Sequence, residues 1–223
     1  MTQTTSPERP ELSAPSDLPF DARALGAYLA AHIPGVSSEL VIQKFAGGQS
    51  NPTYKLQAGE RVMVLRKKPA GQLLATAHMV DREHRVFSAL ADSDVPVPRP
   101  LLYCSDASVI GTEFFVMEYV TGRIFWDPAL PSLQPAERRA MYTEMARVLA
   151  ALHEVDYAAR GLADYGKPGN YFARQIKRWT QQYHAAKTDA LRDMDALIDW
   201  LPAHIPNDDT TTLVHGDYRL DNM

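Results

Sequence analysis

The periodicity of apolar residues changes at about residue 120, and this change restricts the folds open to the chain. Before it, apolar residues occur in short runs separated by turn residues, as in strands; from about residue 130 to 201 they recur at helical spacing. We therefore expect an α+β fold with two lobes, 20–120 and 121–223, divided by a hinge at 118–122.

The first lobe reads as an antiparallel sheet with few helices. Its central feature is a meander that carries a glycine-rich turn between its first two strands. The last strand, "EFFVMEYV", is apolar enough to be buried on both faces. Strands are expected at residues 40–45, 53–57, 61–66 and 113–120, helices at 21–34 and 80–91, and a proline-rich connector at 95–100.

The second lobe is predicted to be mainly helical. Pro135 suits the first turn of a helix that runs to about residue 153. Asn170 is placed to cap a second helix, on which Trp179 and Tyr183 are expected to be core residues. A third helix is expected to end at Pro202.

Composition excludes several classes of protein. With a net charge of −4, the chain lacks the basic excess of nucleic-acid or membrane-surface binders, and no apolar run approaches a membrane span. The single cysteine, Cys104, is expected to be a buried small side chain in a reducing compartment. Residues 1–19 lack the apolar segment of a signal peptide and are expected to be a disordered leader, which makes the cytoplasm the simplest location.

A polar motif, "VHGDYRLDN", carries the clearest chemistry. Asp217 is followed five residues later by Asn222, the spacing found in the catalytic loops of kinase-type phosphotransferases. Such an Asp orients or deprotonates a hydroxyl, and the Asn supplies an oxygen to Mg²⁺. Arg219 lies where protein kinases often place a lysine against the transferred phosphate. Taken alone, the motif could equally be a polar turn.

Four upstream elements in the order of a kinase site favour the catalytic interpretation. The first is the glycine-rich turn, and the second is a cation at the end of the third strand, Arg66 or its neighbour Lys67. Glu83 on the next helix is a partner for that cation, and the main chain after "FFVM" could bind an adenine edge. Each element alone is commonplace, but their order is informative. The turn comprises Gly47, Gly48, Gln49, Ser50 and Asn51, and the adenine segment comprises Glu118, Tyr119 and Val120.

The chain resembles the aminoglycoside-phosphotransferase-like kinases, which share the protein-kinase fold. Within them it is most similar to the branch with the kinase-like N-terminal domain of some acyl-CoA dehydrogenase family proteins. The resemblance covers about residues 20–223 and is carried by "GGQSNPTYKL", "VLRKKPAGQLLATAHMVDREHRVFSAL", "VPVPRPLLYCSD", "GTEFFVMEYVTGR", "GLADYGKPGNYFARQIKRWTQQY" and "VHGDYRLDN". It implies a small-molecule kinase that uses ATP and Mg²⁺, with a hydroxyl acceptor that in this branch is a hydroxyacyl-CoA.

The resemblance also implies roles for individual residues. Asp217 would be the catalytic base and Asn222 a magnesium ligand, while the glycine-rich turn would hold phosphates. Arg66 would replace the family's usual strand lysine, with Lys67 as the alternative, and Glu83 would be its partner. The replacement of lysine by arginine matters because a planar guanidinium contacts phosphates differently from an ammonium.

The sequence departs from the family after the catalytic loop. Family members continue with a second metal-binding Asp and further helices, whereas this sequence stops at Met223. We therefore expect a fragment of a longer kinase with impaired activity of its own, and an uncovered surface on the helical lobe that favours self-association. The alternative is a non-catalytic, nucleotide-binding regulatory module.

One basic helix face gives information about the charge of the phosphate acceptor. Arg174, Lys177 and Arg178 lie at i, i+3 and i+4, so they share a face that would attract an anionic CoA ester and repel a polycationic aminoglycoside. The alternative is an ordinary solvated helix face. An aminoglycoside-type antibiotic kinase remains a further alternative.

Overall fold

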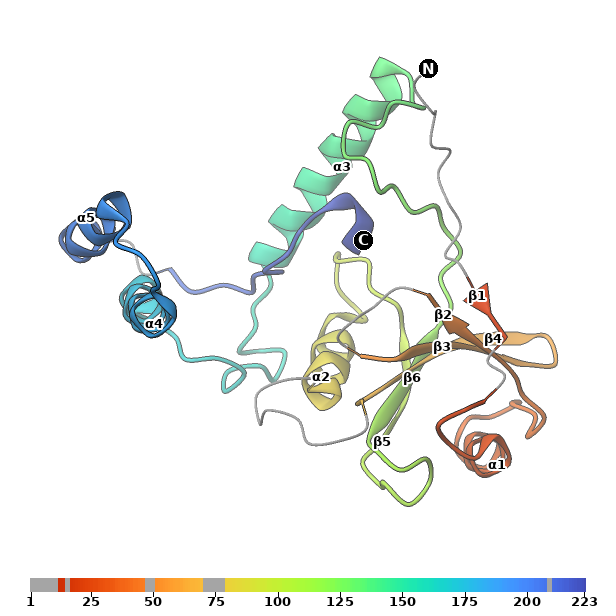
Figure 1. Ribbon diagram of the computed structural model, residues 1–223. Helices are drawn as coiled ribbons and strands as arrows, with labels where there is room; N and C mark the ends of the chain where they lie inside the picture. Colours follow the sequence, from red (N-terminus) through yellow and green to blue (C-terminus); the bar gives the residue numbers. More distant parts are fainter. Residues whose placement is uncertain (1–11, 15–16, 47–50, 70–78, 208–209) are drawn as a thin grey trace. The chain divides into compact units, whose positions relative to one another are not determined.

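The computed structural model describes residues 12–14, 17–46, 51–69, 79–207 and 210–223, and divides the chain into two units (Figure 1). The first unit is Met1–Val155 with Val214–Met223, and the second is Asp156–Leu213. The expected lobe boundary at residue 120 lies inside the first unit and stays a prediction. The first unit contains β1 (Leu12–Ser13), α1 (Ala22–His32), β2 (Val41–Phe45), β3 (Thr53–Ala58), β4 (Arg61–Lys67), α2 (Val80–Leu90), β5 (Pro100–Cys104), β6 (Phe114–Glu118), α3 (Pro135–His153) and the 3₁₀ turn η2 (Leu220–Asn222).

Within the described residues, the sheet of the first unit has six strands in the order β1-β2-β3-β4-β6-β5, and every neighbouring pair is antiparallel. The α+β class and the four expected strands are confirmed, within two residues at each end. The two edge strands, β1 and β5, were not predicted. β5 begins at Pro100, in the proline-rich connector, and a proline is tolerated there because an edge strand leaves one side unpaired.

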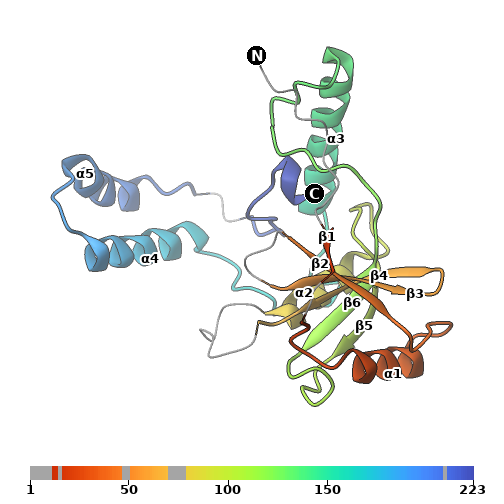
Figure 2. The same cartoon turned by 45° about the vertical axis from the view of Figure 1, so that its right-hand side comes forward.

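Both faces of the sheet are covered, as the apolar strand at 113–120 predicted. Side chains alternate along β6, so that Phe114 and Val116 face a core shared with α1. Phe115 and Met117 face a second core, against α2. Figures 1 and 2 show the two helices on opposite sides of the sheet. Cys104 lies in the core on the α1 side and is buried, as predicted.

Helix α1 begins as its sequence predicted. The Asp21 carboxylate accepts hydrogen bonds from the backbone N–H groups of Arg23 and Ala24, which otherwise lack intrahelical partners. In the middle of the helix, Gly26 lies directly against the backbone of Ser38. A Cβ at position 26 would stand 2.0 Å from the Ser38 carbonyl oxygen, so only glycine allows this close packing.

Helix α3 begins with a capping box. The Gln134 N–H donates to the Glu137 carboxylate, and Pro135 occupies the first turn as expected. A third apolar cluster gathers beside this helix. It consists of Phe125, Leu130, Leu133 and Leu220, with Met141 and Met145 packed against them.

The second unit contains α4 (Tyr171–Ala186), α5 (Arg192–Trp200) and the 3₁₀ turn η1 (Leu201–His204). Asn170 precedes α4 as predicted, but it adopts a left-handed conformation with φ of 51° and its side chain makes no capping hydrogen bond. Helix α5 ends at Trp200, within two residues of the end expected at Pro202, and the chain continues through Pro202 as η1.

The prediction that Trp179 is a core residue is wrong, since 60% of its surface is exposed. Neither α4 nor α5 has a buried residue, because two helices alone cannot enclose side chains of this size. None of the helices in the described ranges combines the length and the apolar character needed to cross a bilayer.

Gly26→Ala is expected to destabilise the first unit. The added methyl group would collide with the Ser38 carbonyl, and overpacking of this kind costs about 1–3 kcal/mol, more than alanine gains in helix propensity. Gly122→Ala is the matched control, because nothing lies within 4 Å of a Cβ built there. Thermal unfolding should show a lower midpoint for the first variant only; equal midpoints would contradict the packing described.

Candidate active site

An ion pair joins the sheet to α2. Arg66 lies near the end of β4, and its Nε is 2.8 Å from Oε2 of Glu83 on α2. Both side chains are about two-thirds covered, at 31% and 33% exposure. Within the described part of the chain neither of these two atoms takes part in an aligned hydrogen bond, so their contact is electrostatic. This is the cation–carboxylate pair that the order of motifs predicted.

Asn51 completes this cluster. Its side-chain amide donates to Oε1 of Glu83 at 3.4 Å, and the residue is only 3% exposed. The sequence placed Asn51 in a phosphate-binding turn, whereas the structure places its side chain against Glu83. Burial raises the pKa of Glu83, while Arg66 and the Asn51 amide act in the opposite direction by stabilising the carboxylate. The other predicted turn residues, 47–50, lie outside the described residues.

Lys67 faces the other side of the sheet. It pairs in register with Phe114, which belongs to the α1 core, whereas Arg66 pairs with Phe115 on the α2 side. Lys67 is 2% exposed, and its ammonium donates to the Lys68 carbonyl at 3.2 Å. Burial lowers the pKa of this lysine. Of the two cations that the sequence left open, Arg66 is therefore the one that contacts Glu83.

The predicted adenine segment follows β6. Glu118 is the last residue of the strand, and its backbone N–H donates to the Arg99 carbonyl at 2.9 Å. Tyr119 packs beside the α2 core, with the Lys55 ammonium 5.1 Å from the centre of its ring. Val120 is 65% exposed. The Glu118 N–H is therefore already engaged within the protein.

The loop that contains Asp217 is anchored to α3 and to the apolar cluster beside it. Tyr218 donates its hydroxyl to the Met145 carbonyl at 2.7 Å, and Leu220 is buried in the third apolar cluster. Gly216 has φ of +84°, a conformation that favours glycine, and it allows the chain to turn just before Asp217. The Asp217 N–H donates to Nδ1 of His215 at 3.4 Å.

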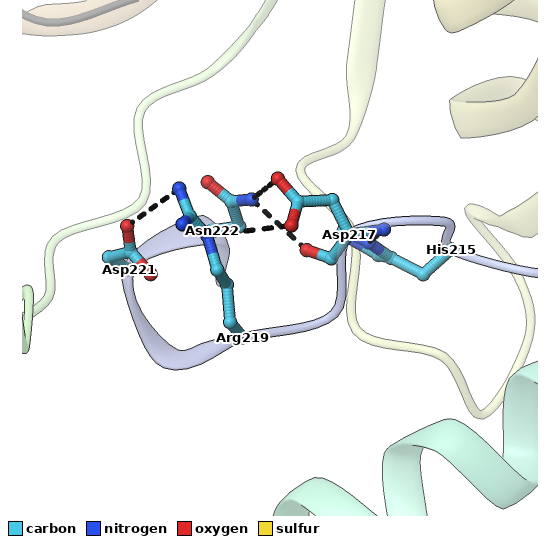
Figure 3. Close-up of polar contacts among 5 residues, drawn as sticks. All are labelled: His215, Asp217, Arg219, Asp221 and Asn222. Carbon is cyan, nitrogen blue, oxygen red and sulfur yellow. Dashed lines mark hydrogen bonds and ion pairs between the residues drawn. The ribbon is translucent and has the colours of Figure 1, made fainter. Parts of the chain in front are cut away.

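The polar ends of the loop meet one another (Figure 3). The Asn222 amide nitrogen donates to the Asp217 carboxylate at 2.6 Å and to its carbonyl at 3.0 Å. Arg219 lies between two carboxylates, with Nε 3.5 Å from Asp217 and Nη2 3.1 Å from Asp221. The five-residue spacing therefore brings the predicted base and the predicted metal ligand into direct contact.

The loop's donor chemistry fits a magnesium ion. Figure 3 shows the carboxamide oxygen of Asn222 turned away from Asp217, so this oxygen remains available to a cation. Mg²⁺ prefers oxygen ligands and retains several waters, so a carboxylate and an amide oxygen suit it. Among the described residues, no group of three His, Cys, Asp or Glu side chains is arranged to hold a metal.

The basic face of α4 is less uniform than its spacing predicted. Arg174 turns back on its own loop, where its guanidinium donates to the carbonyls of Gly169 and Lys167. Arg178 lies against the ring of Trp179, at 5.6 Å from its centre. Lys177 lines an apolar hollow of about 370 Å³ between α4, α5 and η1, together with Ile176 and Ile198.

Predicted residues, joined by Asp221, thus form two contact clusters within the first unit. One is Asn51, Arg66 and Glu83, and the other is Asp217, Arg219, Asp221 and Asn222. Sequence reasoning missed the contributions of Tyr218 and Asp221. The signal for Asp221 is local, because it lies two residues after Arg219 and so can reach its guanidinium. The contact of Tyr218 with Met145, 73 residues away in the chain, has no local signal.

Comparison with known families decides how this arrangement is to be classified. The model of the phosphotransferase enzyme family matches residues 41–223, which include all residues of both clusters; β1 and α1 lie before the matched range. The chain belongs to the phosphotransferase enzyme family.

Relatives within this family include parts of larger proteins. The chain is 47% identical over 219 residues to acyl-CoA dehydrogenase family member 10 of Mus musculus, covering 98% of the chain and 20% of that protein. It is 49% identical over 209 residues to acyl-CoA dehydrogenase family member 11 of Rattus norvegicus, covering 92% of the chain and 27% of that protein. The chain thus spans between a fifth and just over a quarter of the length of these relatives.

A solved structure gives the same fold. The crystal structure of a candidate aminoglycoside phosphotransferase from Ralstonia eutropha JMP134 is 52% identical and superimposes with a TM-score of 0.83. The match covers 91% of this chain and 60% of that one. The fold is therefore that of the phosphotransferase family, with its antiparallel sheet and helices.

Glu83→Gln should change how stability depends on pH. Because the pKa of Glu83 is raised in the folded state, its contribution to stability is present below its unfolded-state pKa and is lost as pH rises through the folded pKa. Relative to wild type, Glu83→Gln should therefore gain stability as pH rises from about 4 to 7. Denaturant unfolding of both proteins across this range measures the difference; a difference that falls with pH would contradict the dominance of burial.

Proposed function

We propose that this protein is an ATP-dependent kinase that transfers phosphate to a hydroxyl group of a small molecule. The observation that carries the proposal is the contact between Asp217 and Asn222, which joins a proton acceptor to an uncharged oxygen ligand in one loop. The Arg66–Glu83 pair supports it, because a guanidinium fixed by a carboxylate suits the phosphates of a nucleotide.

Each residue then has a distinct task. Asp217 orients the acceptor hydroxyl and receives its proton as the oxygen attacks phosphorus. Asn222 would hold Mg²⁺, which would neutralise negative charge on the phosphates when bound. Arg66 contacts the nucleotide phosphates, and Arg219, held between Asp217 and Asp221, offers positive charge to the group in transfer.

The acceptor that we propose is a hydroxyacyl-CoA. Two relatives at 47% and 49% identity are named as acyl-CoA dehydrogenase family members, so the homologous segment occurs in proteins named for acyl-CoA chemistry. The cationic side chains of α4 are compatible with an anionic thioester. Of the three, Lys177 is the one that lines an apolar hollow.

An aminoglycoside is the second candidate acceptor. The observation in its favour is the 52% identity to the candidate aminoglycoside phosphotransferase of Ralstonia eutropha. The two acceptors differ in charge, since an aminoglycoside is a polycation and a CoA ester is an anion. The net charge of the chain, −4, does not separate them, so a direct comparison of substrates is required.

Asp217→Asn is expected to reduce phosphate transfer by about 10²–10⁴-fold, because the amide cannot accept the hydroxyl proton. Binding of Mg²⁺-ATP should change little by comparison. Asp199→Asn, an exposed position on α5, is the control and should keep full activity. Turnover is measured by ADP release and binding by calorimetry. Unchanged turnover in Asp217→Asn would refute the role of this residue.

A substrate screen tests the acceptor. The protein is incubated with Mg²⁺ and ATP and with hydroxyacyl-CoAs, amino alcohols or aminoglycosides, and phosphorylated products are identified by mass spectrometry. We expect product from the hydroxyacyl-CoAs, with lower turnover at high salt because surface charge attraction is screened. Product from aminoglycosides alone would replace the proposed acceptor. Nucleotide binding without any product would favour a regulatory module.

A further inference from the structure

The two carboxylate oxygens of Glu83 have different partners. Oε2 faces Nε of Arg66 at 2.8 Å, and Oε1 accepts the Asn51 amide at 3.4 Å. These partners come from different segments, since Arg66 lies on β4 and Asn51 precedes β3. A carboxylate held at both oxygens cannot rotate about its last bond without losing a contact, so the two interactions restrict each other.

Asn51 is well suited to hold one side of this carboxylate. It is almost fully buried, and its backbone is fixed because the Thr53 hydroxyl donates to its carbonyl at 3.1 Å. Its amide is a neutral donor, so it stabilises the carboxylate without competing with Arg66 as a second cation. A buried donor with fixed backbone loses little entropy when it binds, which favours a positioning role over a solvent-exposed contact with ligand.

We propose that Asn51 is a positioning residue that orients Glu83 toward Arg66 and thereby sets the place of the guanidinium that contacts nucleotide phosphate. This proposal rests on the proposed kinase function for its last step only. The orientation of Glu83 by Asn51 is a property of the protein without nucleotide. Asn51 thus acts through Glu83 rather than by touching the substrate itself.

Two variants and one control test the proposal. Asn51→Ala removes the amide donor, and Asn51→Ser retains a hydroxyl donor on a shorter side chain. The control is Gln57→Ala on β3, whose side chain donates to the Gly59 carbonyl away from Glu83. Each is combined with Glu83→Gln to give a double-mutant cycle, which separates direct coupling from independent structural damage.

The first readout is the titration of the Glu83 carboxyl carbon by NMR in the protein without nucleotide. Asn51→Ala should raise the pKa of Glu83 relative to wild type, because a hydrogen bond to the charged form is lost. In Asn51→Ser the pKa of Glu83 should lie between its values in wild type and in Asn51→Ala, and in Gln57→Ala it should match wild type. An unchanged Glu83 titration in folded Asn51→Ala or Asn51→Ser would overturn the proposal.

The second readout is the dissociation constant of Mg²⁺-ATP. We expect Asn51→Ala to weaken binding about tenfold, the size of one hydrogen bond to a charged group. The loss should largely disappear in the Glu83→Gln background. Equal losses in both backgrounds would show that Asn51 acts independently of Glu83 and would overturn the proposal. Absence of ATP binding by wild type would refute the kinase function, while the Glu83 titration would still decide the role of Asn51.

Discussion

The pairing of β4 with β6, buried between α1 and α2, is the constraint on which the first unit depends. Since side chains alternate along each strand, each pair of positions in this ladder is assigned to one face or the other. Arg66 is consequently directed to the α2 side and Lys67 to the α1 side, although they are adjacent in the chain. A shift of one residue in the register would exchange them and leave Glu83 beside the wrong cation.

The loop that contains Asp217 depends on a separate set of contacts. Leu220 is buried among Phe125, Leu130 and Leu133, and Tyr218 is bonded to the carbonyl of Met145. The residues that alternate with these two, Asp217 and Arg219, remain exposed at 68% and 60% of their side-chain surface. The loop thus alternates anchoring and chemical side chains, which is how a short irregular segment can hold reactive groups in place while leaving them accessible.

Much of the fold and of the site was predictable because it rests on local patterns. The strand and helix periods identified most elements, and the motif spacing identified Asp217 and Asn222. The elements and contacts that were missed or wrongly predicted depend on tertiary context. β1 and β5 are edge strands with weak patterns, and the amphipathic pattern of α4 did not show that Trp179 remains exposed. The contact between Asn51 and Glu83 could not be predicted either, because it requires two segments to meet. The choice between Arg66 and Lys67 likewise needed the register.

The first unit is discontinuous, since Asp156–Leu213 separates α3 from the loop that packs beside it. Leu220 can join Phe125 and Leu130 only after this whole insertion has been synthesised, so the apolar cluster must close late and across a long stretch of chain. The entropy of closing such a loop rises only slowly with its length. Insertions of different size could therefore be exchanged at this point with little effect on the stability of the loop that contains Asp217.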